Sequence, residues 1–346
     1  MSDKLVYLDR NENNYGPAPA CLEVLRRTGA EDLYAYSKAY KRGVKSDLSE
    51  RLANDFRIPE QRVLLGYGAE DILKQLVQCY LSPGQKLLIP AYSWWYYKAI
   101  ADEVKGITSE YPLIKGEDSF YYNIEKMVKI VETEDPRLIF ISSPNNPTGN
   151  SISNKDLEHL LKKFENRIVA LDEAYWYHSQ NEHVIRLINN FGNLVVIRTF
   201  SKYFALAGMR IGYALTGENL SELKKLSNRY LGYNSLSEKV ALAALDSPEY
   251  YQGIARKMDA DKELYYKELN KIPGFRVFKS DANFILVEIP KNMMDPLKKD
   301  LTSRNLIIKF MNEPVLNSHL RITLGTSAQN RKVIDVIKAF VGIETA

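Results

Sequence analysis

The stretch LVVIRTFSK, residues 194–202, decides how this chain folds, and GMR follows it at residues 208–210. The apolar run 194–197 is typical of a buried strand in an α/β sheet. Lys202 comes directly after this strand, at the sheet edge where open α/β folds bind their ligands. A lysine there can lose its proton by desolvation and form a Schiff base with a carbonyl group. A surface lysine after a strand is the common alternative, so other parts of the chain must decide.

Two side chains close to Lys202 in the sequence suit an anionic group. Ser201 offers a hydroxyl and Arg210 offers a planar cation, a pair that is well matched to a phosphate. An amine that can form a Schiff base beside a phosphate site suggests pyridoxal 5′-phosphate (PLP) as the cofactor.

The composition is that of a globular protein and favours no large partner. Of the 346 residues, 45% are hydrophobic and 26% are charged, which is usual for soluble proteins. This length predicts one large and one smaller domain. The formal net charge of +4 is nearly balanced, so no basic face for nucleic acid is expected. No run approaches the ~20 apolar residues of a membrane-spanning helix.

The N-terminal segment and the cysteines point to the cytoplasm. The first residues carry acidic side chains and lack the apolar core of a signal peptide. Cys21 and Cys79 are too few for a disulfide framework and lack the spacing of metal ligands. We therefore expect a cytoplasmic enzyme that acts on small molecules and binds no metal.

Strands and helices alternate up to about residue 215, which predicts a doubly wound, mainly parallel sheet. Its strands are expected at residues 62–65, 86–90, 137–143, 167–171 and 194–197. Mostly helix follows, and strands of a second, smaller sheet are expected at residues 282–287, 306–309 and 319–325. The predicted fold class is α/β, with a large sheet domain and a smaller α+β domain.

Polar or turn-forming residues follow four of the large-sheet strands. GYG, residues 66–68, precedes the N–H groups of Ala69 and Glu70, which suit a phosphate, although a lone Gly-x-Gly turn is a weak signal. PNNPTG, residues 144–149, is more specific because two prolines fix the backbone and direct amides such as that of Asn146 to one spot.

The third strand end, DEAY at residues 172–175, has two interpretations. An apolar strand that ends in Asp-Glu also occurs in P-loop ATPases, where it binds Mg²⁺. That interpretation requires a Gly-x-x-x-x-Gly-Lys-Ser/Thr loop. The nearest candidate, residues 43–46, lacks the second glycine before its lysine, so the ATPase interpretation is rejected.

Aromatic side chains and a polar arm could complete a site. The cluster AYSWWYY, residues 91–97, follows a strand end and could stack on a planar ring, although most such clusters are core. Residues 8–20 are rich in asparagine and proline and form neither a regular helix nor a strand, so they could cover a site or reach a partner subunit.

One ligand explains the features at all four strand ends. PLP needs an amine for its Schiff base, a cradle for its phosphate and an acid beside its ring nitrogen. Asp172 can keep that nitrogen protonated, since an opposite charge favours the charged form. The protonated ring then accepts electrons from the substrate's α-carbon.

The order and spacing of these motifs resemble those of the fold-type-I PLP-dependent aminotransferases. The segments that carry this resemblance are SPNNPTG (143–149), LDEAY (171–175), RTFSK (198–202) and LAGMRIG (206–212). The histidinol-phosphate aminotransferase group, within the class II family, is similar in LDRNENNYGPAP (8–19), GYGAED (66–71) and LRITLGT (320–326). The resemblance extends from about residue 8 to residue 340.

The resemblance implies a role for each cofactor residue. Lys202 should carry PLP as a Schiff base and move the reaction's proton. Asp172 should pair with the pyridinium nitrogen, and Tyr175 and Asn146 should hydrogen-bond the ring's phenolate oxygen. The groups expected to bind the phosphate are Ser201, Arg210 and the backbone at Ala69 and Glu70.

Further residues are implied in contacts with the ring, the substrate and a second subunit. Trp95 should stack on the ring, and Tyr36 should reach the phosphate in the neighbouring subunit, which implies a homodimer. Arg321 should hold the anionic group of the substrate, Tyr15 should lie over the substrate, and Asn146 should also contact it.

Lys309 is a departure from the family pattern. The family commonly has an arginine at the end of this strand, whereas here residues 305–309 end in lysine. A lysine cannot form the bidentate fork that an arginine makes with a phosphate. Whether Lys309 binds a phosphorylated side chain is therefore left open by the sequence.

The leading hypothesis is a ping-pong aminotransferase that takes nitrogen from histidinol phosphate or a related amine and gives it to 2-oxoglutarate. One alternative is an aminotransferase for an aromatic or specialised amino acid. Another is a decarboxylase similar to threonine-phosphate decarboxylase, because the same residues serve both reactions. A non-enzymatic regulator is disfavoured, since the chain starts directly with the arm and no DNA-binding segment precedes it.

The resemblance also implies a division into domains. Residues 1–32 form an arm and first helix that associate with the small domain, residues 33–240 form the large PLP-binding domain, and residues 241–346 form the small domain.

Overall fold

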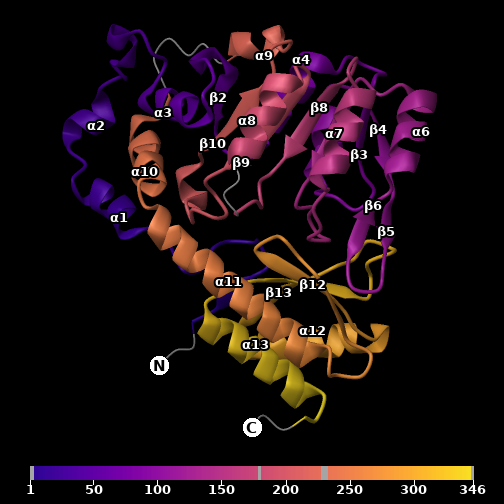
Figure 1. Cartoon of the computed structure of the whole chain (residues 1–346). Helices are drawn as coiled ribbons and strands as arrows, with labels where there is room; N and C mark the ends of the chain where they lie inside the picture. Colours follow the sequence, from indigo (N-terminus) through magenta and orange to yellow (C-terminus); the bar gives the residue numbers. More distant parts are fainter. Residues whose placement is uncertain (1–3, 178–180, 227–232, 344–346) are drawn as a thin grey trace.

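The computed structural model describes residues 4–177, 181–226 and 233–343. Within these residues a seven-stranded sheet and a five-stranded sheet face each other across the molecule, the small sheet below the large one in Figure 1. The prediction of an α/β fold with a large and a small sheet is confirmed.

The large sheet is mainly parallel, as predicted. Its strands, in spatial order, are β2 (Val63–Gly66), β10 (Gly212–Thr216), β9 (Leu194–Thr199), β8 (Ile168–Asp172), β7 (Leu138–Ser142), β3 (Lys86–Pro90) and β4 (Ile107–Tyr111). Strand β10 is antiparallel to both of its neighbours, β2 and β9. The other pairs of adjacent strands are parallel.

Helices cover both faces of the large sheet. Alternate strand residues point to opposite faces, so Ile197 packs in one core cluster and Val196 in the other. On the Ile197 face lie α4 (Ala69–Tyr80), α5 (Tyr96–Glu103) and α9 (Ser221–Leu226). On the Val196 face lie α3 (Asp47–Phe56), α6 (Ile124–Glu134), α7 (Asn154–Lys163) and α8 (Asn181–Asn190).

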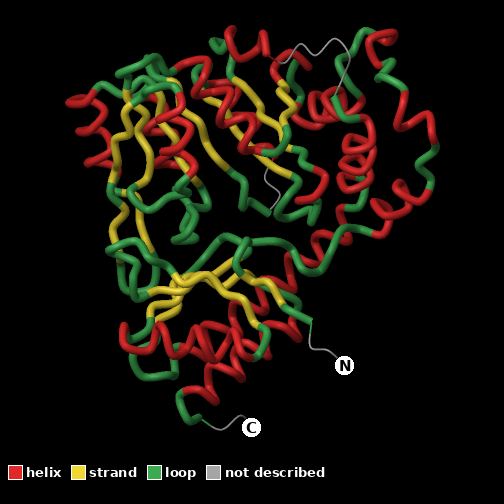
Figure 2. The backbone as a smooth tube through the Cα atoms, turned by 180° about the vertical axis from the view of Figure 1, so that it is seen from behind, coloured by secondary structure: helices red, strands yellow, loops and turns green. Residues whose placement is uncertain are grey.

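The small sheet combines the two ends of the chain. Its strands, in spatial order, are β1 (Val6–Leu8), β13 (Leu306–Phe310), β14 (His319–Thr323), β12 (Phe284–Glu288) and β11 (Arg276–Phe278). Helices α12 (Met294–Ser303) and α13 (Ser327–Phe340) lie beneath it (Figure 2). Because β1 pairs with β13, the arm that follows β1 starts beside the small sheet.

Helix α11 (Pro248–Leu269), 22 residues long, runs from the large-sheet side to the small sheet (Figure 1). The other α-helices of the described residues are α1 (Pro19–Arg26), α2 (Ala30–Tyr34) and α10 (Ser235–Leu245). Strands β5 (Leu113–Lys115) and β6 (Phe120–Tyr122) form a hairpin. Among the described helices, none combines the length and the apolar character that crossing a bilayer would require. The domain boundaries at residues 32 and 240 stay a prediction.

Candidate active site

The carboxyl ends of β2, β7, β8 and β9 lie at one edge of the large sheet. Strands β7, β8 and β9 are parallel neighbours. Strand β2 runs the same way, because β10 is antiparallel to both β2 and β9. The structure therefore brings together the four segments that the sequence placed at strand ends.

Asp172 ends β8 as a buried carboxylate with two hydrogen-bond donors. The Tyr97 hydroxyl donates to Oδ2 at 2.6 Å, and the Ala174 N–H donates to Oδ1 at 2.9 Å. Burial raises the pKa of Asp172, and the hydrogen bonds from Tyr97 and Ala174 oppose this shift. The carboxylate is thus fixed at the sheet edge, where it can pair with a cationic ring nitrogen.

Asn146 connects the two sheets through Tyr175 and Arg321. Its Nδ2 donates to the Tyr175 hydroxyl at 3.1 Å, and its Oδ1 accepts from Arg321 Nη1 at 2.5 Å. Since a guanidinium can only donate, this contact fixes the orientation of the amide. The other terminal nitrogen of Arg321 donates to the carbonyl of Asp9 in the arm. Side chains predicted to contact ring and substrate therefore form one chain of hydrogen bonds.

Lys202 follows β9 and lies beside the arm. Its Nζ donates to the Arg10 carbonyl at 2.8 Å and lies 5.5 Å from the centroid of the Tyr175 ring. Burial, with smaller contributions from Arg321 and Arg210, lowers the pKa of Lys202 to about 8, against a weaker opposite effect of Glu12. The amine can therefore become neutral, and so nucleophilic, close to neutral pH.

The first turn of α4 and the loop after β9 provide groups that fit a phosphate. The N-cap residue of α4 is Gly68, which has no side chain to accept a hydrogen bond from the first turn of the helix, where the N–H groups of Ala69 and Glu70 lie. A Cβ at Gly68, whose φ is +86°, would lie 2.8 Å from Arg210 Nη2. The guanidinium of Arg210 thus lies directly against the turn, where it could contact a phosphate bound at the start of α4.

Arg210 and Ser201 are held by local contacts. Arg210 is itself left-handed, with φ 49°, and its Nη2 donates to the Tyr67 carbonyl at 3.2 Å. Its guanidinium lies 3.6 Å from the carboxylate of Glu70, in an ion pair that is about half exposed. Ser201 is buried, and its hydroxyl accepts from Thr199 at 3.0 Å. These groups together could bind a dianion.

Gly212 of β10 allows the Gly68 turn, at the start of α4, to pack directly against the strand. A Cβ there would lie 2.7 Å from the carbonyl carbon of Gly68 and 2.8 Å from the backbone nitrogen of Ala69. Any larger residue would push the start of α4 away from β10 and from the loop that carries Ser201.

Three of the predicted site residues do not join the hydrogen bonds that connect Tyr175, Asn146 and Arg321. They are Tyr15, Trp95 and Tyr36. The Tyr15 hydroxyl lies 3.0 Å from both Asp261 Oδ2 and Ser327 Oγ, where it ties the arm to α11 and α13. Trp95 is 70% exposed and packs edge-on against Tyr96. Tyr36 is 71% exposed. Their roles in substrate, ring and subunit contacts stay predictions.

Lys309 shares a sheet face with Arg321. The two residues are direct partners in the antiparallel pair of β13 and β14, and directly opposed residues project to the same side. The Lys309 side chain is exposed, whereas Arg321 is half-buried. The pair therefore presents two cations to the space between the two sheets.

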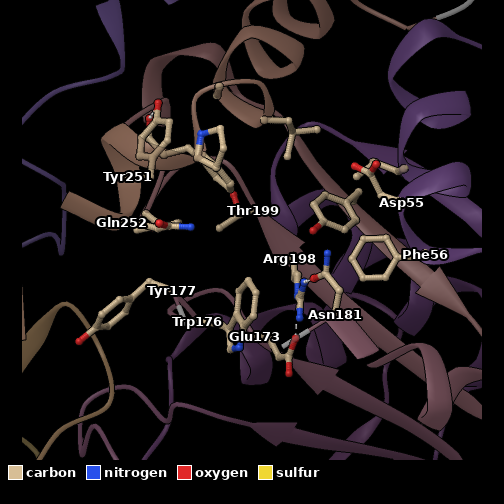
Figure 3. A pocket seen from close by; sticks show the side chains of 17 residues that line it. Asp55, Phe56, Glu173, Trp176, Tyr177, Asn181, Arg198, Thr199, Tyr251 and Gln252 are labelled. Atoms are coloured by element: carbon tan, nitrogen blue, oxygen red, sulfur yellow. Dashed lines mark hydrogen bonds and ion pairs between the residues drawn. The ribbon is translucent and has the colours of Figure 1, made fainter. Parts of the chain in front are cut away.

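A cavity of about 240 Å³ lies close to the loop that carries Lys202. Thr199 and Tyr203, which flank residues 200–202 in the sequence, are among the residues that line this cavity. Figure 3 shows Arg198 and Glu173 among the side chains that line it, joined by an ion pair of 2.7 Å. Trp176 stacks on the Arg198 guanidinium at 3.6 Å. This buried pair fixes β8 against β9 and so supports the neighbouring Asp172 and Lys202. None of the predicted site residues lines this cavity.

Sequence reasoning missed the donors and acceptors that come from outside the strand-end motifs. Tyr97 lies in the aromatic cluster, but no pattern showed which aromatic residue points inward. The carbonyls of Asp9 and Arg10 are main-chain groups, for which the sequence carries no signal. The predicted arm was the only indication that this segment approaches the site.

Comparison with known proteins places these features in one family. The family model described as "Aminotransferase class I and II" matches residues 3–337. A histidinol-phosphate aminotransferase of Ruminiclostridium cellulolyticum is 30% identical over 335 residues, which are 96% of this chain and 92% of that protein. The chloroplastic histidinol-phosphate aminotransferase 1 of Arabidopsis thaliana is 29% identical, over 98% of this chain and 79% of its own.

Solved structures show the same fold. The crystal structure of histidinol-phosphate aminotransferase from Sinorhizobium meliloti, in complex with pyridoxal-5'-phosphate, is similar with a TM-score of 0.85. The alignment covers 98% of this chain and 91% of that one, at 21% identity. At this identity the likeness concerns the fold alone.

Proposed function

Since this chain belongs to the class I and II aminotransferases, within the histidinol-phosphate aminotransferase group, we propose that it transfers an amino group from histidinol phosphate to 2-oxoglutarate. Its cofactor is PLP. The two substrates react in turn, by a ping-pong mechanism, at the carboxyl edge of the large sheet. The observation that carries the proposal is the gathering of Asp172, Asn146 and Lys202 at this edge.

The residues at the edge fit the cofactor group by group. The buried carboxylate of Asp172 would hold the ring nitrogen in its protonated form. The Tyr175 hydroxyl and the Asn146 amide, already hydrogen-bonded to each other, would bind the phenolate oxygen. The groups that would hold the phosphate are Ser201, Arg210 and the N–H groups of Ala69 and Glu70.

When bound, PLP supplies a carbonyl that takes up the amino group and a ring that accepts the electron pair from the α-carbon. Lys202 would hold the cofactor covalently through Nζ, and its pKa of about 8 makes this amine available as a nucleophile and a proton acceptor near neutral pH. The Nζ of Lys202 would also serve as the general base of the reaction.

The small sheet binds the substrates. Arg321 would form a bidentate pair with the carboxylate of glutamate or 2-oxoglutarate. Lys309, opposite Arg321 in the register, would contribute charge for the phosphate of the donor. Tyr15 would cover the substrate from the arm. Arg321 is well placed for this role because its Nη1 already contacts Asn146.

The test is a spectral titration of the PLP-loaded protein at neutral pH. Glutamate and histidinol phosphate should each convert the absorption band of the lysine-bound cofactor into that of the aminated cofactor. Absence of this change with glutamate would contradict the proposal.

Two other outcomes would identify the alternatives. If glutamate converts the absorption band and histidinol phosphate does not, the amino donor would be an aromatic or specialised amino acid. Release of CO₂ without transfer of nitrogen would indicate the decarboxylase.

A homodimer in the cytoplasm is also part of the proposal. The homodimer is supported by a cluster of exposed apolar side chains near the N-terminus: Leu33 is 74% exposed, Tyr34 76% and Tyr36 71%. Such a cluster suits an interface with a second copy. Light scattering of the purified protein should give twice the mass of the chain, and replacement of Tyr36 by alanine should weaken PLP binding if this side chain reaches the neighbouring site.

A further inference from the structure

We propose that Tyr97 is a positioning residue that keeps Asp172 ionised and aimed at the cofactor's ring nitrogen. This inference rests on the proposed function, in which Asp172 pairs with that nitrogen. The sequence placed Tyr97 only within the aromatic cluster 91–97 and gave it no role of its own.

The hydrogen bond between the two side chains is short and buried. Tyr97 is the second residue of α5 and is 1% exposed, and Asp172 is 4% exposed. The hydroxyl donates to Oδ2 at 2.6 Å, and burial and the nearby carboxylate hold the pKa of Tyr97 well above its usual value. Tyr97 therefore stays protonated and remains a donor throughout the working pH range.

Two aromatic neighbours fix the ring of Tyr97. It meets Phe140 of β7 edge-on, with centroids 5.1 Å apart, and Trp94 edge-on at 6.1 Å. Edge-to-face contacts of this kind favour one ring orientation. The hydroxyl is thus directed at Asp172 by packing that does not depend on Asp172 itself.

The charge on Asp172 depends on this donor. Burial and the adjacent carboxylate of Glu173 both raise the pKa of Asp172, whereas the hydrogen bonds from Tyr97 and Ala174 lower it. Among the residues that the structure describes, Tyr122 and Tyr175 are further ionisable groups that interact with Asp172. The Ala174 donor is a backbone N–H, so the Tyr97 hydroxyl is the side-chain donor that a substitution can remove.

The test is the PLP dissociation constant as a function of pH, measured by quenching of tryptophan fluorescence. Tyr97→Phe keeps the packed ring and removes the donor. A hydrogen bond to a charged group is worth about tenfold or more in an equilibrium constant. We expect PLP to bind about tenfold more weakly at neutral pH, and the acid-side loss of affinity to move up by about one pH unit.

Tyr111→Phe is the matched control. Tyr111 is also completely buried and donates to the carbonyl of Phe140 at 3.0 Å, without a hydrogen bond to Asp172. It should lose a similar amount of thermal stability and keep the wild-type affinity for PLP and its pH dependence. In an Asp172→Asn background, Tyr97→Phe should add no further loss of PLP affinity.

The outcomes separate this inference from the proposed function. If Asp172→Asn weakens PLP binding while Tyr97→Phe behaves like Tyr111→Phe, the role of Tyr97 is wrong and the proposed function stands. If Asp172→Asn itself leaves PLP affinity unchanged, the proposed role of Asp172 is wrong, and that of Tyr97 falls with it.

Discussion

The edge of the large sheet and the facing side of the small sheet are built in different ways. At the large-sheet edge, Asp172 and Lys202 come from the ends of adjacent parallel strands. The two groups that donate hydrogen bonds to Asp172 are the Tyr97 hydroxyl of α5 and the Ala174 N–H just after β8. At the small sheet, Arg321 contacts Asn146 of the large-sheet edge and the carbonyl of Asp9 in the arm. The Asp172 carboxylate is held by groups of the large-sheet side alone, and Lys202 adds one contact with the arm at the Arg10 carbonyl. Arg321, by contrast, is held by contacts with the large-sheet edge and the arm.

This difference predicts that cofactor binding and substrate binding can be altered separately. A change at the large-sheet edge should alter the handling of the cofactor and therefore every reaction of the enzyme. A change at the small-sheet face should alter the substrates and leave the affinity for the cofactor intact. Three substitutions and one pH profile test this division, and their expected effects decrease from Lys202 to Lys309.

Lys202→Ala should have the largest effect. Loss of a nucleophile that also moves the proton should lower kcat by at least about 10³-fold, since general acid–base catalysis alone contributes about 10²- to 10⁴-fold. Steady-state kinetics with glutamate and 2-oxoglutarate measure the loss, and circular dichroism verifies the fold. A loss smaller than tenfold would mean that the chemistry lies elsewhere.

Arg321→Ala should lower kcat/KM for glutamate by about 100-fold, because a charge-assisted bidentate pair is lost. PLP affinity should remain within about twofold of the wild-type value if cofactor and substrate regions are separable. Arg321→Lys, which keeps the charge and loses the fork, should recover only part of the loss. A loss of PLP affinity as large as the loss of kcat/KM would show that the cofactor and substrate regions are not separable.

The pH dependence of PLP capture should show the lowered pKa of Lys202. Only the neutral amine attacks, and burial lowers the pKa from 10.5 to about 8, so the rate should rise with pH and level off above that value. Between neutral pH and the plateau the expected rise is about tenfold. Stopped-flow absorbance measures it, and a rate that still rises beyond about pH 10 would show a lysine with its ordinary pKa.

Lys309→Ala should have the smallest effect. Because Lys309 is exposed, its contribution to binding a phosphate is screened and should be about two- to fivefold in KM for histidinol phosphate. Glutamate kinetics should not change. Lys309→Arg should lower the same KM, since arginine binds a phosphate bidentately. A change that affects both substrates equally would mean that Lys309 acts through Arg321.

The large-sheet edge was predictable from the sequence because each strand carries its functional residue at its own end. Lys202, Asp172 and Asn146 follow apolar runs, and the carboxyl ends of parallel strands meet at one edge. Strand β10, residues 212–216, was not among the predicted strands. Its antiparallel direction could not have been predicted either, because hydrophobic periodicity does not reveal strand direction.

The small-sheet face required the structure. The direct pairing of Lys309 with Arg321 depends on strand register, which neither segment shows by itself. Strand β1 is three residues long, too short for a periodic signal, so the pairing that anchors the arm could not be predicted. The inward orientation of Tyr97 depends on where α5 begins within a run of aromatic residues.

We propose that Lys202 holds the cofactor because of its position at the carboxyl edge of the large sheet. A low pKa alone does not identify it, since burial also lowers the pKa of Lys45 to about 8. Lys45 is a natural internal control, because its Nζ donates at 3.0 Å to the carbonyl of Val63, at the opposite end of β2.

The most direct measurement is therefore reduction of the PLP-loaded protein with borohydride, followed by peptide mass spectrometry. Reduction makes the bond between lysine and cofactor permanent, so the modified peptide identifies the residue. We expect one phosphopyridoxyl group per chain, on Lys202. A label on Lys45, or one spread over several lysines, would contradict it.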